Sequence, residues 1–191
     1  LPVPVIAKLG LLRTFQQTRI YGKLNCVENM LISHKDSDAN IMTIFSKIPK
    51  DLTERAENLL NFVGLYQKRK LRAGDLSFGQ QKLLELAMAL MNEPEMLLLD
   101  EPTAGVDPTA RRKLHWLINA TKRRGATIVL TTHHIDEAAS LGERVGIMVK
   151  GYMCCLGTTQ HLLHHYGEGY MLNAFMVAGC SIDEILLPKV K

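Results

Sequence analysis

Two short apolar runs, residues 96–99 and 128–130, constrain the fold of this 191-residue chain more than any other feature. Each run lies between segments with helical patterns, and each ends in polar residues. Short, fully apolar strands that alternate with helices are typical of a parallel sheet with helices on both faces. The sequence therefore predicts an α/β fold. A third strand is expected over residues 144–151, with residues 152–157 pairing back on it as a hairpin.

The remaining segments carry helical signals. Residues 52–63 have one apolar face, and Asp51 followed by Glu54 predicts a capping box with Asp51 as the cap. A second helix is expected from residue 77 to the residues before Pro94. Residues 107–125 begin with an aspartate cap and a proline, and they end on a glycine. Because apolar strands are missing before residue 93, we infer a helical subdomain attached to, or inserted into, the α/β core.

Composition allows a substantial core and gives no strong charge signal. Hydrophobic residues make up 47% of the chain, and the net charge is +4. Basic residues cluster at 68–72, 111–113 and 122–124, which fits exposed helix faces better than a site for nucleic acid or anionic lipid. The four cysteines lack metal-type spacing and are interpreted as reduced thiols of a cytosolic protein. The sequence has no apolar run near the roughly 18–20 residues that span a bilayer.

Polar residues follow both apolar runs. Asp100 and Glu101 follow the first run, and Thr131, Thr132 and His133 follow the second. Reactive groups of parallel α/β sheets lie at the carboxyl ends of the strands. One carboxylate to hold Mg²⁺, a second to take a proton from water and a nearby histidine suit phosphoryl transfer to water. The alternative is a solvated acid pair with a satisfied histidine, and spacing alone leaves both interpretations open.

The stretch "LSFGQQ" places Ser77 and Gly79 at the start of a helix. A helix N-terminus offers unpaired N–H groups and the positive end of the helix dipole, and glycine allows close approach of the backbone. These features predict a phosphate-binding turn. Ser77 can also serve simply as the N-cap of the helix, and the two roles are compatible.

Together these stretches resemble the nucleotide-binding domain of ABC transporters. "LSFGQ" (76–80) is similar to the signature motif, "MLLLDEPTAGVDP" (96–108) to the Walker B strand and D-loop, and "VLTTHHIDEA" (129–138) to the H-loop. "RTFQ" (13–16) resembles the Q-loop. The four motifs occur in the family's order. The resemblance implies a partial P-loop NTPase (RecA-like) fold: a parallel sheet with helices on both faces, plus a helical subdomain.

The resemblance implies a role for each residue of the chain's own half-site. Asp100 would orient Mg²⁺ through water, and Glu101 would be the general base that polarises the attacking water. His133 would contact the γ-phosphate of ATP, with His134 as a second candidate expected to face elsewhere. Gln16 would sense the metal and the attacking water and couple them to the helical subdomain.

A second group of residues is implied to act across a dimer interface. Ser77, Gly79 and Gln80 would hold the γ-phosphate of an ATP bound by a partner domain, and Asp107 would lie in the D-loop. Phe78 occupies a position where the family usually has glycine, a departure that the signature motif tolerates.

The phosphate-binding loop G-x-x-x-x-G-K-[ST] is missing from the sequence. Gly22 and Lys23 are followed by Leu24, and Gln17 stands where the earlier glycine belongs. In the family this loop precedes the Q-loop. We therefore expect the chain to start after that loop and to be inactive alone, with natural degeneracy as the alternative.

The resemblance also implies a division of the chain. Residues 1–16 would be a remnant of the α/β core, 17–80 the helical subdomain ending in the signature motif, 81–157 the core with Walker B, D-loop and H-loop, and 158–191 a C-terminal extension. The N-terminal half resembles ATPases of branched-chain amino-acid importers. The C-terminal half resembles the lipid-exporting A subfamily.

The implied function is that of an ATPase, which cleaves a phosphoric anhydride, with ATP and Mg²⁺ as ligands. It would form a head-to-tail dimer with a second nucleotide-binding domain, contact the transmembrane domains of a transporter and lie on the cytoplasmic face of a membrane. The substrate would be a lipid or another hydrophobic molecule, and nucleic acid is not an expected partner. Two alternatives remain: a non-catalytic module that donates its signature motif to another chain's ATP, and a soluble ABC ATPase of the DNA-repair or translation type.

Overall fold

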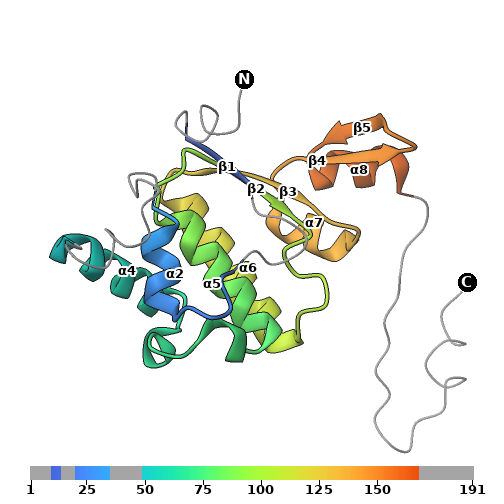
Figure 1. Ribbon diagram of the computed structural model, residues 1–191. Coiled ribbons are helices and arrows are strands. Elements are labelled where there is room, and N and C mark those ends of the chain that lie inside the picture. Colours follow the sequence, from blue (N-terminus) through green and yellow to red (C-terminus); the bar gives the residue numbers. More distant parts are fainter. Residues whose placement is uncertain (1–9, 14–19, 35–48, 168–191) are drawn as a thin grey trace, which may run out of the picture. The chain divides into compact units, whose positions relative to one another are not determined.

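The computed structural model describes residues 10–13, 20–34 and 49–167 (Figure 1). The chain forms two compact units, Leu1–Val145 and Gly146–Lys191. The first unit contains a parallel three-stranded sheet in the order β1-β2-β3, formed by β1 (Leu11–Arg13), β2 (Met96–Asp100) and β3 (Thr127–Thr131). The α/β fold with a parallel sheet that the sequence predicted is therefore confirmed.

The central strand β2 sets the register of the sheet. Leu97 lies opposite Leu12 of β1 and Ile128 of β3, and Asp100 lies opposite Thr131. The two predicted strands are confirmed, but the expectation of no strand before residue 93 was wrong. With three residues, β1 is too short to give a periodic signal, and its pairing with β2 defines it as a strand.

Helices supply most of the first unit. They are α2 (Cys26–Ile32), α4 (Lys50–Phe62), α5 (Phe78–Leu90), α6 (Pro108–Arg123) and α7 (Ile135–Leu141), with short 3-10 turns at Tyr66–Lys68 and Ala73–Asp75. In Figure 1, α5 and α6 run beneath the sheet. Burial alternates along β2, where Leu97 and Leu99 are buried in the same core cluster as Leu84, Leu114 and Leu117 of the helices.

Helix α4 confirms the helix predicted over residues 52–63, but the predicted capping box was wrong. The helix begins at Lys50, its N-cap is Pro49, and no side chain caps it. Asp51 therefore lies inside the first turn, where its negative charge still interacts favourably with the helix dipole. Gly64, with φ of 71°, follows the helix end as expected.

The predicted start of α6, with an aspartate cap followed by a proline, is confirmed. Asp107 is the N-cap, and its Oδ1 accepts hydrogen bonds of 3.0 Å from the backbone N–H groups of Thr109 and Ala110. Pro108 follows in the first turn, where a missing N–H costs nothing. Gly125 lies just past the helix with φ of 98°, a conformation that glycine adopts without strain.

The second unit contains the predicted hairpin and a helix. Strands β4 (Val145–Val149) and β5 (Tyr152–Gly157) pair with each other, and α8 (Thr159–Tyr166) follows. Lys150 and Gly151 connect them with φ of 50° and 85°, the positive values typical of tight hairpin turns. The expected third strand exists, but it is not part of the parallel sheet in the described residues, because its partner there is β5.

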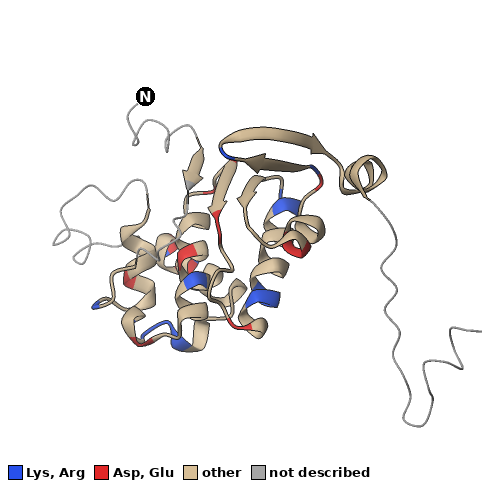
Figure 2. Ribbon diagram, turned by 90° about the vertical axis from the view of Figure 1, so that its right-hand side faces the viewer, with Lys and Arg blue, Asp and Glu red and all other residues tan. Residues whose placement is uncertain are grey.

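Figure 2 shows acidic and basic residues interspersed along the helices of the first unit. This distribution resembles an ordinary solvated surface. Within the ranges that the structure describes, every helix is too short or too polar to cross a bilayer.

Truncating the central strand is expected to destabilise the first unit. Leu97 is fully buried, so Leu97→Ala leaves a cavity and should lower the free energy of unfolding by about 2–5 kcal/mol. Urea unfolding followed by circular dichroism measures this change. Ile135→Ala is the matched control, because Ile135 is 84% exposed and its truncation should change stability by only about 0.5 kcal/mol or less. Equal effects of the two substitutions would contradict the central position of β2.

Candidate functional site

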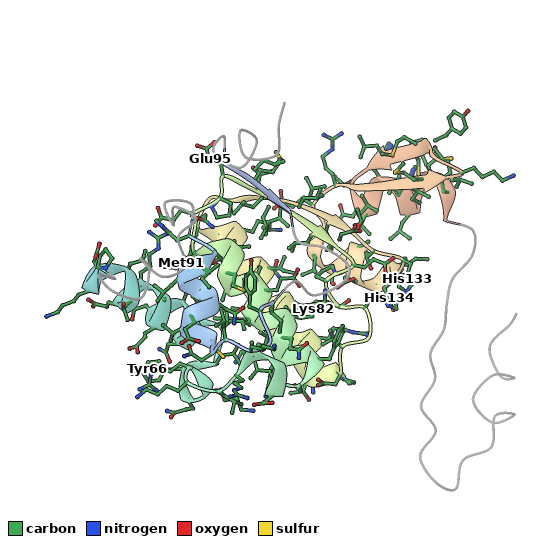
Figure 3. All side chains as sticks on the ribbon, viewed as in Figure 1. Tyr66, Lys82, Met91, Glu95, His133 and His134 are labelled. Atoms are coloured by element: carbon green, nitrogen blue, oxygen red, sulfur yellow. The ribbon has the colours of Figure 1, made fainter. Side chains whose placement is uncertain are left out.

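The first group of predicted site residues lies at the carboxyl ends of β2 and β3. Asp100 ends β2 and pairs in register with Thr131, which ends β3. Glu101 and His133 follow on the two connecting loops. Figure 3 shows His133 and His134 side by side, far from Glu95, which precedes β2. Parallel pairing therefore brings together polar groups that are about thirty residues apart in the sequence.

Asp100 is tied to the neighbouring strand through its side chain. The hydroxyl of Thr131 donates a hydrogen bond of 2.6 Å to Asp100 Oδ1. A hydrogen bond to a carboxylate is stronger than one between neutral groups, and it fixes the orientation of the acid. Asp100 is consequently held at the strand end in a defined rotamer.

Glu101 has an unusual backbone conformation. Its φ is 45°, in the left-handed region that non-glycine residues seldom adopt. Two backbone hydrogen bonds hold it there: its N–H donates to Thr131 O at 3.0 Å, and its carbonyl accepts from Ala104 N at 3.1 Å. Such conformations cost roughly 1–3 kcal/mol and cluster at functional sites. The turn directs the Glu101 side chain to the loop after β3.

The Glu101 carboxylate meets His133. His133 Nδ1 lies 3.2 Å from Glu101 Oε1, and because a carboxylate only accepts, the Nδ1 proton of His133 is the donor. The His133 side chain is 62% exposed, so its outer nitrogen, Nε2, can reach a ligand. The ring of His134 packs on that of His133 with centroids 4.1 Å apart, although we expected it to face elsewhere. His133 is the histidine of this pair that bonds Glu101.

The second predicted group lies at the start of α5. Ser77 is the N-cap: its hydroxyl accepts from the backbone N–H of Gln80 at 3.4 Å, and Gln80 Oε1 accepts from Ser77 N at 3.2 Å. Lys68 Nζ also donates to Gln80 Oε1, at 3.1 Å. This reciprocal capping box confirms the helix start and places a lysine beside it.

Gly79 brings the start of α5 against the start of α6. A Cβ atom at Gly79 would lie 2.7 Å from Ala110 Cβ and 3.1 Å from Asp107 Oδ2, distances that leave no room for a side chain. The Phe78 ring also lies against Gly105, in the loop before α6. A Cβ atom at Gly105 would lie 3.4 Å from that ring. The structure thus joins Ser77, Gly79, Gln80 and Asp107 into one group. Gln16 lies outside the described residues.

Glu137 is a buried acid that the sequence reasoning did not single out. It is 4% exposed and lies in the first turn of α7, four residues after His133. Thr132 Oγ1 donates to Glu137 Oε2 at 2.6 Å, and His115 Nε2 of α6 lies 2.9 Å from Oε1. The available sequence signal was an acid in the first turn of a helix, preceded by Asp136 and followed by two alanines.

The pKa of Glu137 reflects two opposing effects. Burial alone would raise it, but hydrogen bonds from Thr132, Thr103 and His115 and the nearby charge of His115 together hold it below its ordinary value. Thr103 contributes although its buried hydroxyl does not meet full hydrogen-bond geometry with any group. The carboxylate is therefore the preferred form of this buried side chain.

The strand-end residues fit a magnesium ion held with help from a phosphate ligand. Asp100, Glu101 and Thr131 offer oxygen atoms, the donors that Mg²⁺ prefers, and Mg²⁺ commonly uses only one or two carboxylates plus substrate phosphates. Within the described part of the chain, no three His, Cys, Asp or Glu side chains are arranged to hold a metal by themselves. The donor set thus suits an ion that arrives with a nucleotide.

A family model described as "AAA domain, putative AbiEii toxin, Type IV TA system" matches residues 32–138, which is more than half of the chain.

Curated relatives are much longer than this chain. The phospholipid-transporting ATPase ABCA7 of Homo sapiens is 43% identical over 116 residues, which are 61% of this chain and 5% of the relative. ABC transporter A family member 9 of Arabidopsis thaliana is 42% identical over 123 residues, 64% of this chain and 13% of the relative. The retinal-specific phospholipid-transporting ATPase ABCA4 of Homo sapiens is 36% identical over 151 residues, 77% and 7% of the two chains.

Solved structures with the same fold are ATP-binding cassettes. The ADP conformation of one cassette of an ABC transporter matches with a TM-score of 0.71 and 28% identity, over 86% of this chain and 66% of that chain. A nucleotide-free cassette matches with a TM-score of 0.69 and 28% identity, over 81% and 63% of the two chains. This chain spans slightly less than two thirds of each.

Glu137 should make stability depend on pH. Its pKa in the folded chain lies below the ordinary value of 4.5, so its stabilising contribution is complete above that value and is lost as the pH falls through the lower, folded pKa. Glu137→Gln should therefore destabilise the chain near neutral pH, and the difference from the natural chain should shrink in acid. Urea unfolding across a pH series measures this. Asp136→Asn, which removes an exposed neighbouring charge, is the control, and a pH-independent effect of Glu137→Gln would refute the assignment.

Proposed function

Because the chain belongs to the AAA domain family and forms part of an ABC-type nucleotide-binding domain, we propose that it supplies an ATP-hydrolysing half-site to a membrane transporter. The observation that carries this proposal is the contact between Glu101 and His133 beside Asp100. These side chains occupy the strand ends where nucleotides bind in open α/β sheets.

In the proposed mechanism, each of the three strand-end residues has one task. Asp100, oriented by the Thr131 hydroxyl, would hold hydrated Mg²⁺, an ion that would supply positive charge opposite the developing phosphate charge. Glu101 accepts the proton of the attacking water as general base, and its left-handed turn aims it at the open end of the sheet. His133, held by Glu101 through Nδ1, would donate a hydrogen bond from Nε2 to the γ-phosphate when both ring nitrogens carry a proton. Gln16 is assigned to sensing metal and water by its motif alone.

The α5 start is proposed to act on a nucleotide held by a second domain. Ser77, Gly79 and Gln80 offer the N-terminus of a 13-residue helix, and the Lys68 ammonium beside it adds positive charge. Asp107, pressed against Gly79, would lie in the same dimer interface. This arrangement supports a head-to-tail dimer with two ATP molecules between the domains.

The transported substrate is proposed to be a phospholipid or similar hydrophobic molecule. Two of the relatives are named as phospholipid-transporting ATPases, and the A family is the recurring name among them. The shared transporter names also favour transport over the toxin mentioned in the description of the family model. The domain would contact transmembrane domains on the cytoplasmic face of a membrane, and the proposed division at residues 16, 80 and 157 follows the family's motifs.

A non-catalytic partner module is the second candidate. The 191 residues do not contain G-x-x-x-x-G-K-[ST], the loop whose N–H groups and lysine hold ATP phosphates. In such a module the Ser77 turn would still contact an ATP bound by the partner domain. Glu101 would face no ATP and would catalyse nothing. The two candidates therefore differ in whether Glu101 matters for turnover.

Substituting the proposed general base should separate hydrolysis from binding. In a complete nucleotide-binding domain that contains this chain, Glu101→Gln should lower the phosphate-release rate by roughly 10²–10⁴, while ATP binding persists. Glu143→Gln is the matched control, because Glu143 is 81% exposed and forms a surface pair with Lys122 that contributes little. An unchanged rate in Glu101→Gln would remove Glu101 from the mechanism and favour the non-catalytic module.

The 191 residues alone should release no phosphate from ATP. The proposed half-site lacks the loop that holds the phosphates, so the general base has no positioned substrate. A phosphate-release assay on the purified chain, with Glu101→Gln as the background control, measures this. A rate that Glu101→Gln abolishes would show that phosphate binding is supplied by other residues of the chain.

A further inference from the structure

We propose that Glu137 is a positioning residue for His133: through Thr132, its buried carboxylate fixes the loop that presents His133 to Glu101. The positioning itself is a property of the chain without nucleotide. Its importance for hydrolysis rests on the proposed function.

His133 has little packing of its own to hold it. Its side chain is 62% exposed, and the neighbouring His134 ring and the Glu101 carboxylate are its contacts of note. The backbone fixes where the Cβ atom of such a side chain lies, and therefore which groups the ring can reach. The constraints on residues 132–137 therefore decide whether Nδ1 meets Glu101.

Thr132, immediately before His133, is held on two sides. Its hydroxyl donates to Glu137 Oε2 at 2.6 Å and accepts from the backbone N–H of His134 at 3.1 Å. The hydroxyl thus links the residue after His133 to the carboxylate one helical turn later. These two bonds close a tight loop around His133, and without the carboxylate the Thr132 hydroxyl keeps only its bond from His134 N–H.

Glu137 is itself anchored outside that loop. His115 of α6 lies 2.9 Å from Oε1, and Thr103, in the loop after β2, also lowers the pKa of this acid. One carboxylate therefore joins α6 to the loop that carries His133. A buried acid with several partners is expected to hold its surroundings in one arrangement, because each lost bond leaves a buried polar group unpaired.

A purely structural role is the competing explanation. Glu137 lies in the first turn of α7, where any acid interacts favourably with the helix dipole. Asp136 shares that first turn but is exposed. A dipole effect would be similar for both acids and would leave the ring state of His133 unchanged.

The test measures the tautomer of His133 by nitrogen NMR on the histidine-labelled chain, without nucleotide. The chain has seven histidines, and loss of one signal in His133→Gln assigns the resonance. The spectra are recorded at about pH 8.5, about two units above the usual pKa of histidine side chains. The natural chain should show His133 protonated on Nδ1, and Glu101→Ala should shift it toward the Nε2-protonated form.

Glu137→Gln should lower the Nδ1-protonated fraction of His133 roughly twofold or more, because the loop is released, whereas Asp136→Asn should leave it unchanged. Circular dichroism reports whether each variant folds. If Glu137→Gln does not fold, variants of Thr132 provide the test. Thr132→Val removes the hydroxyl and should shift the His133 tautomer, whereas Thr132→Ser keeps the hydroxyl and should not. An unchanged His133 tautomer in a folded Glu137→Gln or Thr132→Val variant overturns the proposal.

A second measurement links the positioning to catalysis. In a complete nucleotide-binding domain, Glu137→Gln should lower kcat with little change in the KM for ATP, and it should add little to the effect of His133→Ala. Fully additive effects would contradict action through His133. If His133→Ala leaves kcat intact while the tautomer shift occurs, the proposed function fails but the positioning by Glu137 stands.

Discussion

The parallel register between β2 and β3 determines where the reactive groups of this chain can lie. Because Asp100 pairs with Thr131, both strands end at the same level of the sheet. Glu101, directly after Asp100, and His133, two residues after Thr131, then meet at one edge of the sheet. A shift of the register by one residue would turn every side chain of β3 to the opposite face and separate this group.

Hydrogen bonds hold two unfavourable features in place near that edge, a strained backbone and a buried charge. The strained backbone of Glu101 is held by hydrogen bonds to Thr131 and Ala104. The buried carboxylate of Glu137 is compensated by hydrogen-bond partners from two segments, α6 and the loop after β3. In both cases the hydrogen bonds favour one arrangement of the loops. Burial of the leucine core offsets the free-energy cost of the strained backbone and the buried charge.

The sequence predicted the elements with strong local signals and missed those that depend on distant pairing. The strand before Asp100, the aspartate cap of α6 and the hairpin turn follow from local patterns of burial, capping and backbone conformation. Strand β1 has only three residues and exists through β2, so no periodicity announced it. Glu137 resembled any acid in a first helical turn, because its partner His115 is 22 residues away. The capping box at Asp51 failed because α4 starts earlier, at Lys50.

The absence of a side chain at Gly79 has a mechanical consequence. The beginnings of α5 and α6 touch so closely there that no atom separates them. Because the two helix starts are in direct contact, a movement of the Ser77 turn toward α6 would displace the Asp107 turn as well. Even a single methyl group at position 79 would lie 2.7 Å from Ala110 Cβ and force the two turns apart, so their close contact depends on glycine at this position.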